Sequence, residues 1–128
     1  MMKTRYDSQH NAVIVEFSGD VTVAEAEQVF ADLDNVLPKH GKGFMLLTDF
    51  STVKTMEMGI KQEIEEAMEL FDAMWVTEIL RVLPDPAMDI GFNVLSISHY
   101  SKHPKVITCR TRQEADAYLR DQKTNIKK

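Results

Sequence analysis

The sequence contains one cysteine, Cys109, only four prolines, and no apolar stretch that approaches the length of a membrane span. A single cysteine cannot form an internal disulfide, and we expect it to be a buried, inert residue of a strand. The sequence has no CxxC pair or cysteine–histidine cluster of the kind that binds zinc. Residues 1–7 lack the apolar segment of a signal peptide. These absences predict a cytoplasmic protein that does not insert into membranes and holds no metal or other cofactor.

The chain has fewer basic than acidic residues. The chain has 15 lysine and arginine residues against 20 aspartate and glutamate residues, which gives a net charge of -5 at pH 7. The basic residues are scattered except in positions 123–128, so we expect no nucleic-acid partner. Residues 123–128 are predicted to be a frayed basic tail. Residues 1–122 are predicted to form one domain, because a chain of 128 residues with 44% apolar content can bury a single core.

The order of strand and helix signals predicts an α/β fold. Strand-like runs, most of them rich in β-branched and aromatic residues, occur at residues 1–7, 12–17, 44–47, 76–83 and 105–109. Helical spacing of apolar residues follows each strand after the first, and capping boxes at Thr22 with Glu25 and Thr111 with Glu114 start the first and last helices. The order is therefore ββαβαβαβα. We expect an N-terminal hairpin within a mixed, mainly parallel sheet flanked by helices.

Two segments carry a resemblance to a known family. They are residues 47–53, with the sequence LTDFSTV, and residues 112–119, with the sequence RQEADAYL. Together with the element order over nearly the whole chain, they resemble the STAS superfamily, which comprises anti-sigma-factor antagonists and the cytoplasmic domains of sulfate transporters. The similarity is to its bacterial SpoIIAA-like branch, whose fold is similar to CRAL-TRIO lipid-binding domains. The resemblance implies a regulatory module that binds a protein partner.

The resemblance also implies a place for a regulatory switch. In the signalling members, an aspartate-containing strand end leads into a helix that begins with a phosphorylatable serine just before a glycine. Here Met58 stands before Gly59, and the connecting segment is one residue shorter than the family pattern. Methionine cannot accept a phosphate, so we expect the usual serine phosphoswitch to be missing. Ser51 or Thr55 could replace it, although both are residue types that cap helices.

Asp49 is the best single polar candidate for a site. The pattern places it at the carboxyl end of a central strand, which is where α/β proteins bind ligands. At that position it would either contribute to a ligand site or cap the helix that follows. An alternative function is therefore a small hydrolase or transferase with a site near Asp49, Ser51 and Thr55. The sequence has no nucleophile elbow and no glycine-rich phosphate loop, and His99 and His103 lack the further ligands that a metal needs. We therefore predict a protein that is not an enzyme.

The predicted helix at residues 87–101 has an unusually wide apolar arc, which leaves only a narrow polar stripe that includes Tyr100. Covering one face of a sheet needs an arc only somewhat above 100°. Two interpretations of the surplus flank stay open: neighbouring helices cover it, or it forms a homodimer contact or a groove for an apolar small molecule. That flank consists of Ile90, Val94 and Ile97. Trp75 and the eight methionines are further candidates for an adaptable partner surface.

The sequence thus predicts a non-enzymatic regulatory or interaction module. Its expected partners are another protein, a second copy of itself or an apolar small molecule. The candidate binding residues are Asp49, Ser51, Thr55, Met58, Ile90, Val94 and Ile97.

Overall fold

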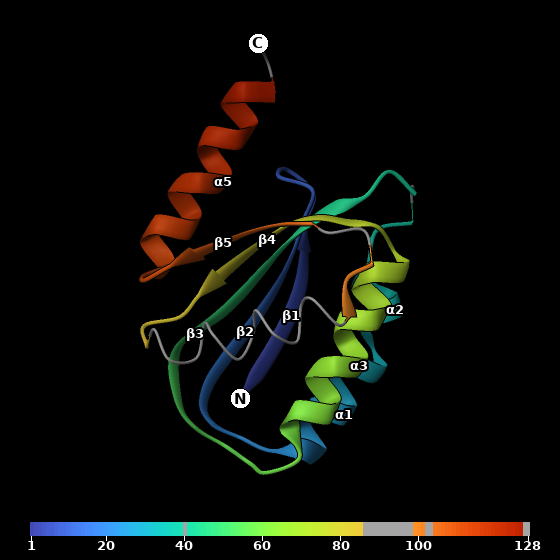
Figure 1. The fold of residues 1–128 in the computed structure, drawn as a ribbon, viewed down its shortest axis with the longest axis vertical. Helices are drawn as coiled ribbons and strands as arrows, with labels where there is room; N and C mark the ends of the chain where they lie inside the picture. The colour runs from blue at the N-terminus through green and yellow to red at the C-terminus, as the bar shows by residue number, and fades with distance from the viewer. Residues whose placement is uncertain (40, 86–98, 102–103, 127–128) are drawn as a thin grey trace.

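A five-stranded mixed sheet organises the chain (Figure 1). The computed structural model describes residues 1–39, 41–85, 99–101 and 104–126. Its strands are β1 (Met2–Asp7), β2 (Ala12–Val21), β3 (Phe44–Met56), β4 (Val76–Val82) and β5 (Lys105–Cys109). They lie side by side in the order of the sequence, with β1 antiparallel to β2 and the following neighbours parallel. The predicted hairpin and the mixed, mainly parallel sheet are both confirmed.

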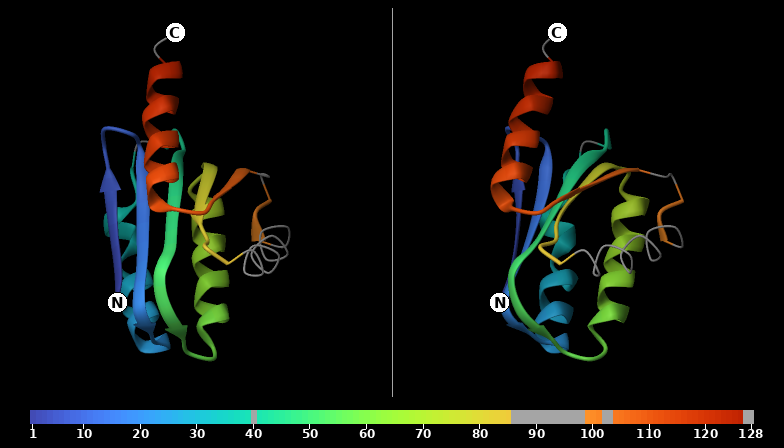
Figure 2. Two further views of the ribbon diagram at one scale, coloured as in Figure 1. Left: turned by 90° about the vertical axis from the view of Figure 1, so that its left-hand side faces the viewer. Right: turned by 60° about the vertical axis from the view of Figure 1, so that its left-hand side comes forward.

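Helices cover both faces of this sheet. One face packs against α1 (Val23–Ala31), α2 (Leu33–Val36) and α3 (Ile60–Ala73), and the other carries α5 (Arg112–Ile126) (Figure 1, Figure 2). α5 continues to Ile126, so it includes the first four residues of the predicted tail. Of the predicted helix at 87–101, the structure describes residues 99–101, and residue 99 is helical. Within the described ranges, no helix has both the length and the apolar composition needed to cross a membrane.

Local hydrogen bonds mark where helices begin and end. The hydroxyl oxygens of Thr22 and Thr111 each accept the backbone N–H three residues later, at 3.2 Å, and this confirms both predicted helix starts. Apolar residues continue at helical spacing from Ala26 to Leu37, which predicts one helix, but the structure divides this segment at Asp32 into α1 and α2. The Asp32 carboxylate accepts a hydrogen bond from the Asn35 side chain. The Asp32 N–H donates to the carbonyl oxygen of Val29 at 3.2 Å, so the last turn of α1 is tightened to a three-residue spacing.

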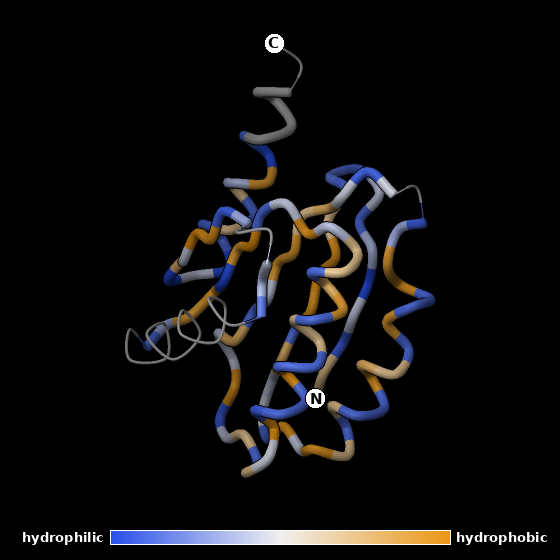
Figure 3. The backbone as a smooth tube through the Cα atoms, turned by 45° about the vertical axis from the view of Figure 1, so that its right-hand side comes forward, coloured by the Kyte–Doolittle hydropathy of each residue, from blue (hydrophilic) through white to orange (hydrophobic). Residues whose placement is uncertain are grey.

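The sheet separates two hydrophobic clusters of unequal size. Because side chains alternate along a strand, Val13, Val15 and Phe17 of β2 join the cluster under α1 and α3, whereas Ile14 joins the cluster under α5. The larger cluster contains the stacked rings of Phe17 and Phe50, whose centroids are 4.4 Å apart. Figure 3 shows the apolar residues concentrated in the central strands and interspersed with hydrophilic ones along the helices. The α5 face has the smaller core.

Candidate functional site

β3 is longer than the sequence predicted, and its length moves three candidate residues. The strand does not end near Asp49 but continues to Met56, where it still pairs with Val21 of β2. Asp49 therefore lies in the middle of β3, and Ser51 and Thr55 lie within the strand. The predictions of a strand-end Asp49 and of helix-capping roles for all three residues are wrong. The segment from Ser51 onward is rich in β-branched residues, which favour a strand over a helix start.

Asp49 belongs to a cluster of charged residues beneath α5. Nη1 of Arg112, the first residue of α5, donates to Glu16 Oε2 at 2.7 Å and to Asp49 Oδ2 at 3.1 Å. Nε of Arg112 donates to Asp116 Oδ1 at 3.0 Å, and Asp49 Oδ1 accepts the Ser51 N–H at 2.8 Å. We call Glu16, Asp49, Arg112 and Asp116 the Arg112 cluster. Its role is to hold α5 against β2 and β3, so the Asp49 carboxylate is already engaged.

These contacts stabilise the protonated, positively charged form of Arg112. Burial disfavours the charged guanidinium, but hydrogen bonds to Glu16, Asp116 and Asp49 outweigh burial and raise the pKa of Arg112. Asp49 itself is only 8% exposed. A charged group in such surroundings needs a paired counter-charge, and Arg112 supplies it. The cluster is therefore a structural clamp.

Thr55 lies at the corner where β3 leads into α3. Its exposed hydroxyl donates to Asp20 Oδ1 of β2 at 2.8 Å. Two contacts from Glu57 tie the same corner to the β2–α1 connection. The Glu57 N–H donates to the carbonyl oxygen of Val21 at 2.9 Å, and Glu57 Oε1 accepts the Val23 N–H at 3.4 Å. Neighbouring strand–helix connections therefore form one surface.

Met58 projects from this corner. It is 95% exposed, and Gly59 follows it as the N-cap of α3 with a φ of 95°. Glycine adopts this left-handed conformation without steric cost, and a Cβ there would come within 3.4 Å of the Val23 side chain. We call Asp20, Thr55 and residues 57–59 the α3 corner. The corner presents an apolar side chain among polar neighbours, immediately ahead of a helix.

Trp75, another candidate anchor, lies at the far end of α3. It is 58% exposed and adopts a left-handed backbone with a φ of 68°. Because α3 has 14 residues, about 20 Å separates Trp75 from Met58 along the helix. The two residues belong to different surfaces. Among the other methionines, Met68 is buried in the larger cluster.

The remaining candidates do not assemble with the α3 corner. His99 Nε2 lies 3.3 Å from Glu65, and His99 Nδ1 lies 3.2 Å from Glu69, so this histidine packs against α3. In the part of the chain that the structure describes, no three histidine, cysteine or acidic side chains are arranged to hold a metal ion. The interface predicted for the third helix stays a prediction. His103, Ile90, Val94 and Ile97 lie outside the described residues.

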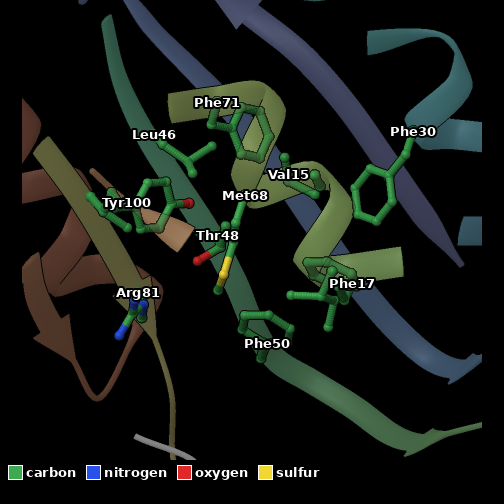
Figure 4. Close-up of a pocket in the computed structure, with 13 residues that line it drawn as sticks. Val15, Phe17, Phe30, Leu46, Thr48, Phe50, Met68, Phe71, Arg81 and Tyr100 are labelled. Carbon is green, nitrogen blue, oxygen red and sulfur yellow. The ribbon is translucent and has the colours of Figure 1, made fainter. Parts of the chain in front are cut away.

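A small cavity lies between the sheet and α3 (Figure 4). Its volume is about 30 Å³, and its walls are mostly apolar side chains from β2, β3, β4, α1 and α3. The polar residues that line it are Thr48, Arg81 and Tyr100. The sequence placed Tyr100 on a polar stripe, but the structure buries it to 3% exposure. Arg81 was not singled out from the sequence, because its strand pattern gives no sign of a buried charge.

No protein-family model matches the sequence, and a comparison with curated protein sequences finds no match either. Solved structures do match. The anti-sigma factor antagonist SpoIIAA in its unphosphorylated form aligns with a TM-score of 0.64 and 14% identity, over 94% of this chain and 98% of that chain. This chain has a SpoIIAA-like fold. The resemblance predicted from the sequence is confirmed at that level.

Further structures agree on the SpoIIAA-like fold. A DUF3478-family protein with a SpoIIAA-like fold from Shewanella loihica PV-4 aligns with a TM-score of 0.67 and 11% identity, over 93% of this chain and 92% of that chain. The phosphorylated form of the Bacillus cell fate determinant SpoIIAA aligns with a TM-score of 0.60 and 13% identity, over 92% of this chain and 99% of that chain. Alignments over nearly full lengths mean that the likeness covers the whole SpoIIAA-like domain.

Proposed function

We propose that this protein is a non-enzymatic regulatory module that binds a protein partner through the α3 corner and does so without a serine phosphoswitch. The observation that carries the proposal is the 95% exposure of Met58 directly ahead of α3. The fold supports it, because the similar structures include an anti-sigma factor antagonist in unphosphorylated form and SpoIIAA in phosphorylated form. The α3 corner is the place that the sequence resemblance implies for such a switch.

The chemistry of the corner suits a protein contact. A methionine side chain is flexible and polarizable, so it adapts to an apolar pocket on a partner. The same corner contains the carboxylates of Asp20 and Glu57 and the hydroxyl of Thr55. Protein interfaces commonly combine an apolar centre with a polar rim of this kind. A partner that offers an apolar pocket for Met58 with basic groups beside it would fit.

Phosphorylation at the corner is disfavoured. Met58 has no hydroxyl, and the Thr55 hydroxyl donates to the Asp20 carboxylate at 2.8 Å. A phosphate on Thr55 would stand against that carboxylate, and two like charges at such a distance repel. Ser51 lies within β3 and is only partly exposed. These contacts support a partner surface whose state does not depend on a serine kinase.

Two further parts of the proposal concern the site of action and the absence of catalysis. We place the module in the cytoplasm, which its single cysteine supports, because a lone thiol forms no internal disulfide. A hydrolase or transferase centred on Asp49 is less well supported, since that carboxylate is committed to Arg112. Self-association through Ile90, Val94 and Ile97 stays a prediction.

The proposal is tested with the variant Met58→Asp. Proteins from an extract of the source organism are captured on the immobilised wild type, and the partner is purified and titrated by calorimetry. Burial of one methionine side chain contributes about 1.5–3 kcal/mol, so Met58→Asp should weaken binding by roughly ten- to a hundredfold. The control is Trp75→Asp, which changes an exposed apolar residue at the other end of α3 and should bind normally. Equal affinities of Met58→Asp and the wild type would contradict the proposal.

A further inference from the structure

A groove with an apolar floor runs between α1 and α3, which contact each other on the same side of the sheet (Figure 1). Its volume is about 540 Å³. The residues of α3 that line it extend from Gln62 to Leu70 at the spacing of one helix face, so the groove follows α3 for about 12 Å, or roughly two turns. Among its apolar lining residues, Leu33 and Ala67 are buried, and Phe30 and Leu70 are partly buried. The groove therefore presents apolar surface between two helices.

Three glutamates also line this groove. Glu27 belongs to α1, and Glu63 and Glu66 belong to α3. Among the residues that the structure describes, no lysine, arginine or histidine lines the groove. Desolvation raises the pKa of Glu63, and the charges of Glu66 and Glu27 raise it further. Carboxylates that repel one another in this way would be stabilised by a cation placed between them.

Other acidic residues of α3 are already paired with basic groups. Lys61 Nζ lies 3.7 Å from Glu65, and the ring nitrogens of His99 lie 3.3 Å from Glu65 and 3.2 Å from Glu69. In the described part of the chain, no basic side chain forms an ion pair with any of the three groove glutamates. The negative charge of the groove is therefore available to a partner.

The charge and shape of the groove select the kind of occupant. Acidic side chains repel nucleic acid and anionic membrane surfaces. A metal ion is not indicated, since the described residues contain no group of three histidine, cysteine or acidic side chains arranged to hold one. A groove between two helices accommodates a third helix, whose apolar face packs against the floor. Basic residues beside that apolar face would lie against the glutamates.

We propose that the groove between α1 and α3 binds a basic amphipathic helix of the protein partner. The apolar side chains of that helix pack against Phe30 and Leu70, and its lysine or arginine residues pair with Glu27, Glu63 and Glu66. Both halves of this recognition are needed, because the floor offers no charge and the glutamates offer no apolar surface.

The groove continues the surface of the α3 corner. Gln62 is the first residue of α3 that lines it, and it lies about one helical turn after Gly59. One partner can therefore contact both surfaces. The inference rests on the proposed function for the partner being a protein, but it assigns a different contact, which does not involve Met58.

A model peptide measures the groove directly. A fluorescently labelled helical peptide of leucine and lysine, with all leucines on one face, is titrated with the full chain and followed by fluorescence anisotropy. It is compared with a peptide that has glutamate in place of lysine, a peptide that has serine in place of leucine, and spermidine as an unlabelled competitor. We expect the leucine–lysine peptide to bind at least about tenfold more tightly than either altered peptide. Spermidine has charge without an apolar face, so it should compete only at concentrations about a hundredfold higher.

Two substitutions that change the net charge equally locate the contact. Glu63→Lys alters the groove, whereas Glu114→Lys alters an exposed residue of α5 on the other face of the sheet (Figure 1). Glu63→Lys should weaken binding of the leucine–lysine peptide roughly three- to tenfold, and Glu114→Lys should weaken it less than about twofold. Leu70→Ala removes apolar surface from the floor and should weaken binding about fivefold. Circular dichroism checks the fold of each variant, and Glu63→Gln repeats the test with a smaller change.

Met58→Asp separates the groove from the α3 corner, since the peptide should bind this variant as it binds the wild type. The proposal is overturned if Glu63→Lys and Glu114→Lys weaken binding equally, or if Met58→Asp weakens it as much as Glu63→Lys. It is overturned as well if the glutamate peptide or spermidine binds as tightly as the leucine–lysine peptide. Sedimentation supplies the last test: if the wild type self-associates and Glu63→Lys abolishes this, the groove holds a second copy of the chain and the proposed partner helix is wrong.

Discussion

Replacement of Arg112 by alanine removes the clamp between α5 and the sheet. In the variant Arg112→Ala, Glu16 and Asp49 remain side by side on β2 and β3 without their shared cation. The two carboxylates then repel each other, and Asp49 is left only the Ser51 N–H among the contacts described above. We expect the variant to fold but to be less stable, with α5 more loosely held.

The size of this effect follows from the burial of the partners. The side chains of Arg112 and Asp49 are 24% and 12% exposed, so their pair lies between a surface pair and a buried one. Exposed ion pairs contribute about 0.2–1 kcal/mol, and loss of one partner of a buried pair costs about 3–5 kcal/mol. An intermediate cost of about 2 kcal/mol in the free energy of unfolding is expected for Arg112→Ala. A comparable surface substitution, Lys61→Ala, should cost less than about 0.5 kcal/mol, because Lys61 is 73% exposed.

Urea unfolding followed by circular dichroism measures both variants and completes a double-mutant cycle with Asp49→Ala. We expect a coupling energy between Arg112 and Asp49 of about 1–2 kcal/mol. A coupling below about 0.3 kcal/mol, or an Arg112→Ala variant as stable as Lys61→Ala, would refute the clamp. Hydrogen exchange adds an independent readout, since the amides of α5 should lose more protection than those of α3 in Arg112→Ala.

Three further outcomes are expected. Incubation with a serine-threonine kinase of the anti-sigma type should leave the protein unmodified by mass spectrometry, whereas stoichiometric phosphate on Ser51 or Thr55 would show that a switch is present. Cys109 is 5% exposed and burial raises its pKa, so iodoacetamide should alkylate the native protein at least about tenfold more slowly than the unfolded one; equal rates would contradict its burial. In Gly43→Ala, a Cβ would lie 2.8 Å from the Thr77 side chain at a φ of 86°, so urea unfolding should show a loss of about 2 kcal/mol or more, and wild-type stability would contradict the strain.

Much of the fold could be predicted because its signals are local. Thr22 and Thr111 start helices through bonds to residues three positions away, and such spacing is visible in a sequence. The alternation of strands and helices also predicts parallel pairing. α1 ends at Asp32, whose N–H donates to the carbonyl oxygen three residues back, and periodic apolar spacing does not reveal that change of backbone geometry.

The candidate site was harder to predict because it depends on strand neighbours. The segment after Asp49 contains residue types that both cap helices and form strands, and pairing with β2 decided in favour of the strand. Arg112 meets Glu16 and Asp49 across separations of 96 and 63 residues, which no local pattern encodes. Met58 was identified only through the family resemblance. Its exposure depends on the turn at Gly59, which the sequence alone did not specify.

Contact at position 58 is the most direct test of partner binding through the α3 corner. Met58 is replaced by the photo-crosslinking residue p-benzoylphenylalanine in cells of the source organism, and Trp75 is replaced in a parallel strain as the control. After illumination, we expect position 58 to crosslink to one discrete protein that position 75 does not capture. No adduct at position 58, or the same adducts from both positions, would contradict the assignment of the α3 corner as the partner surface.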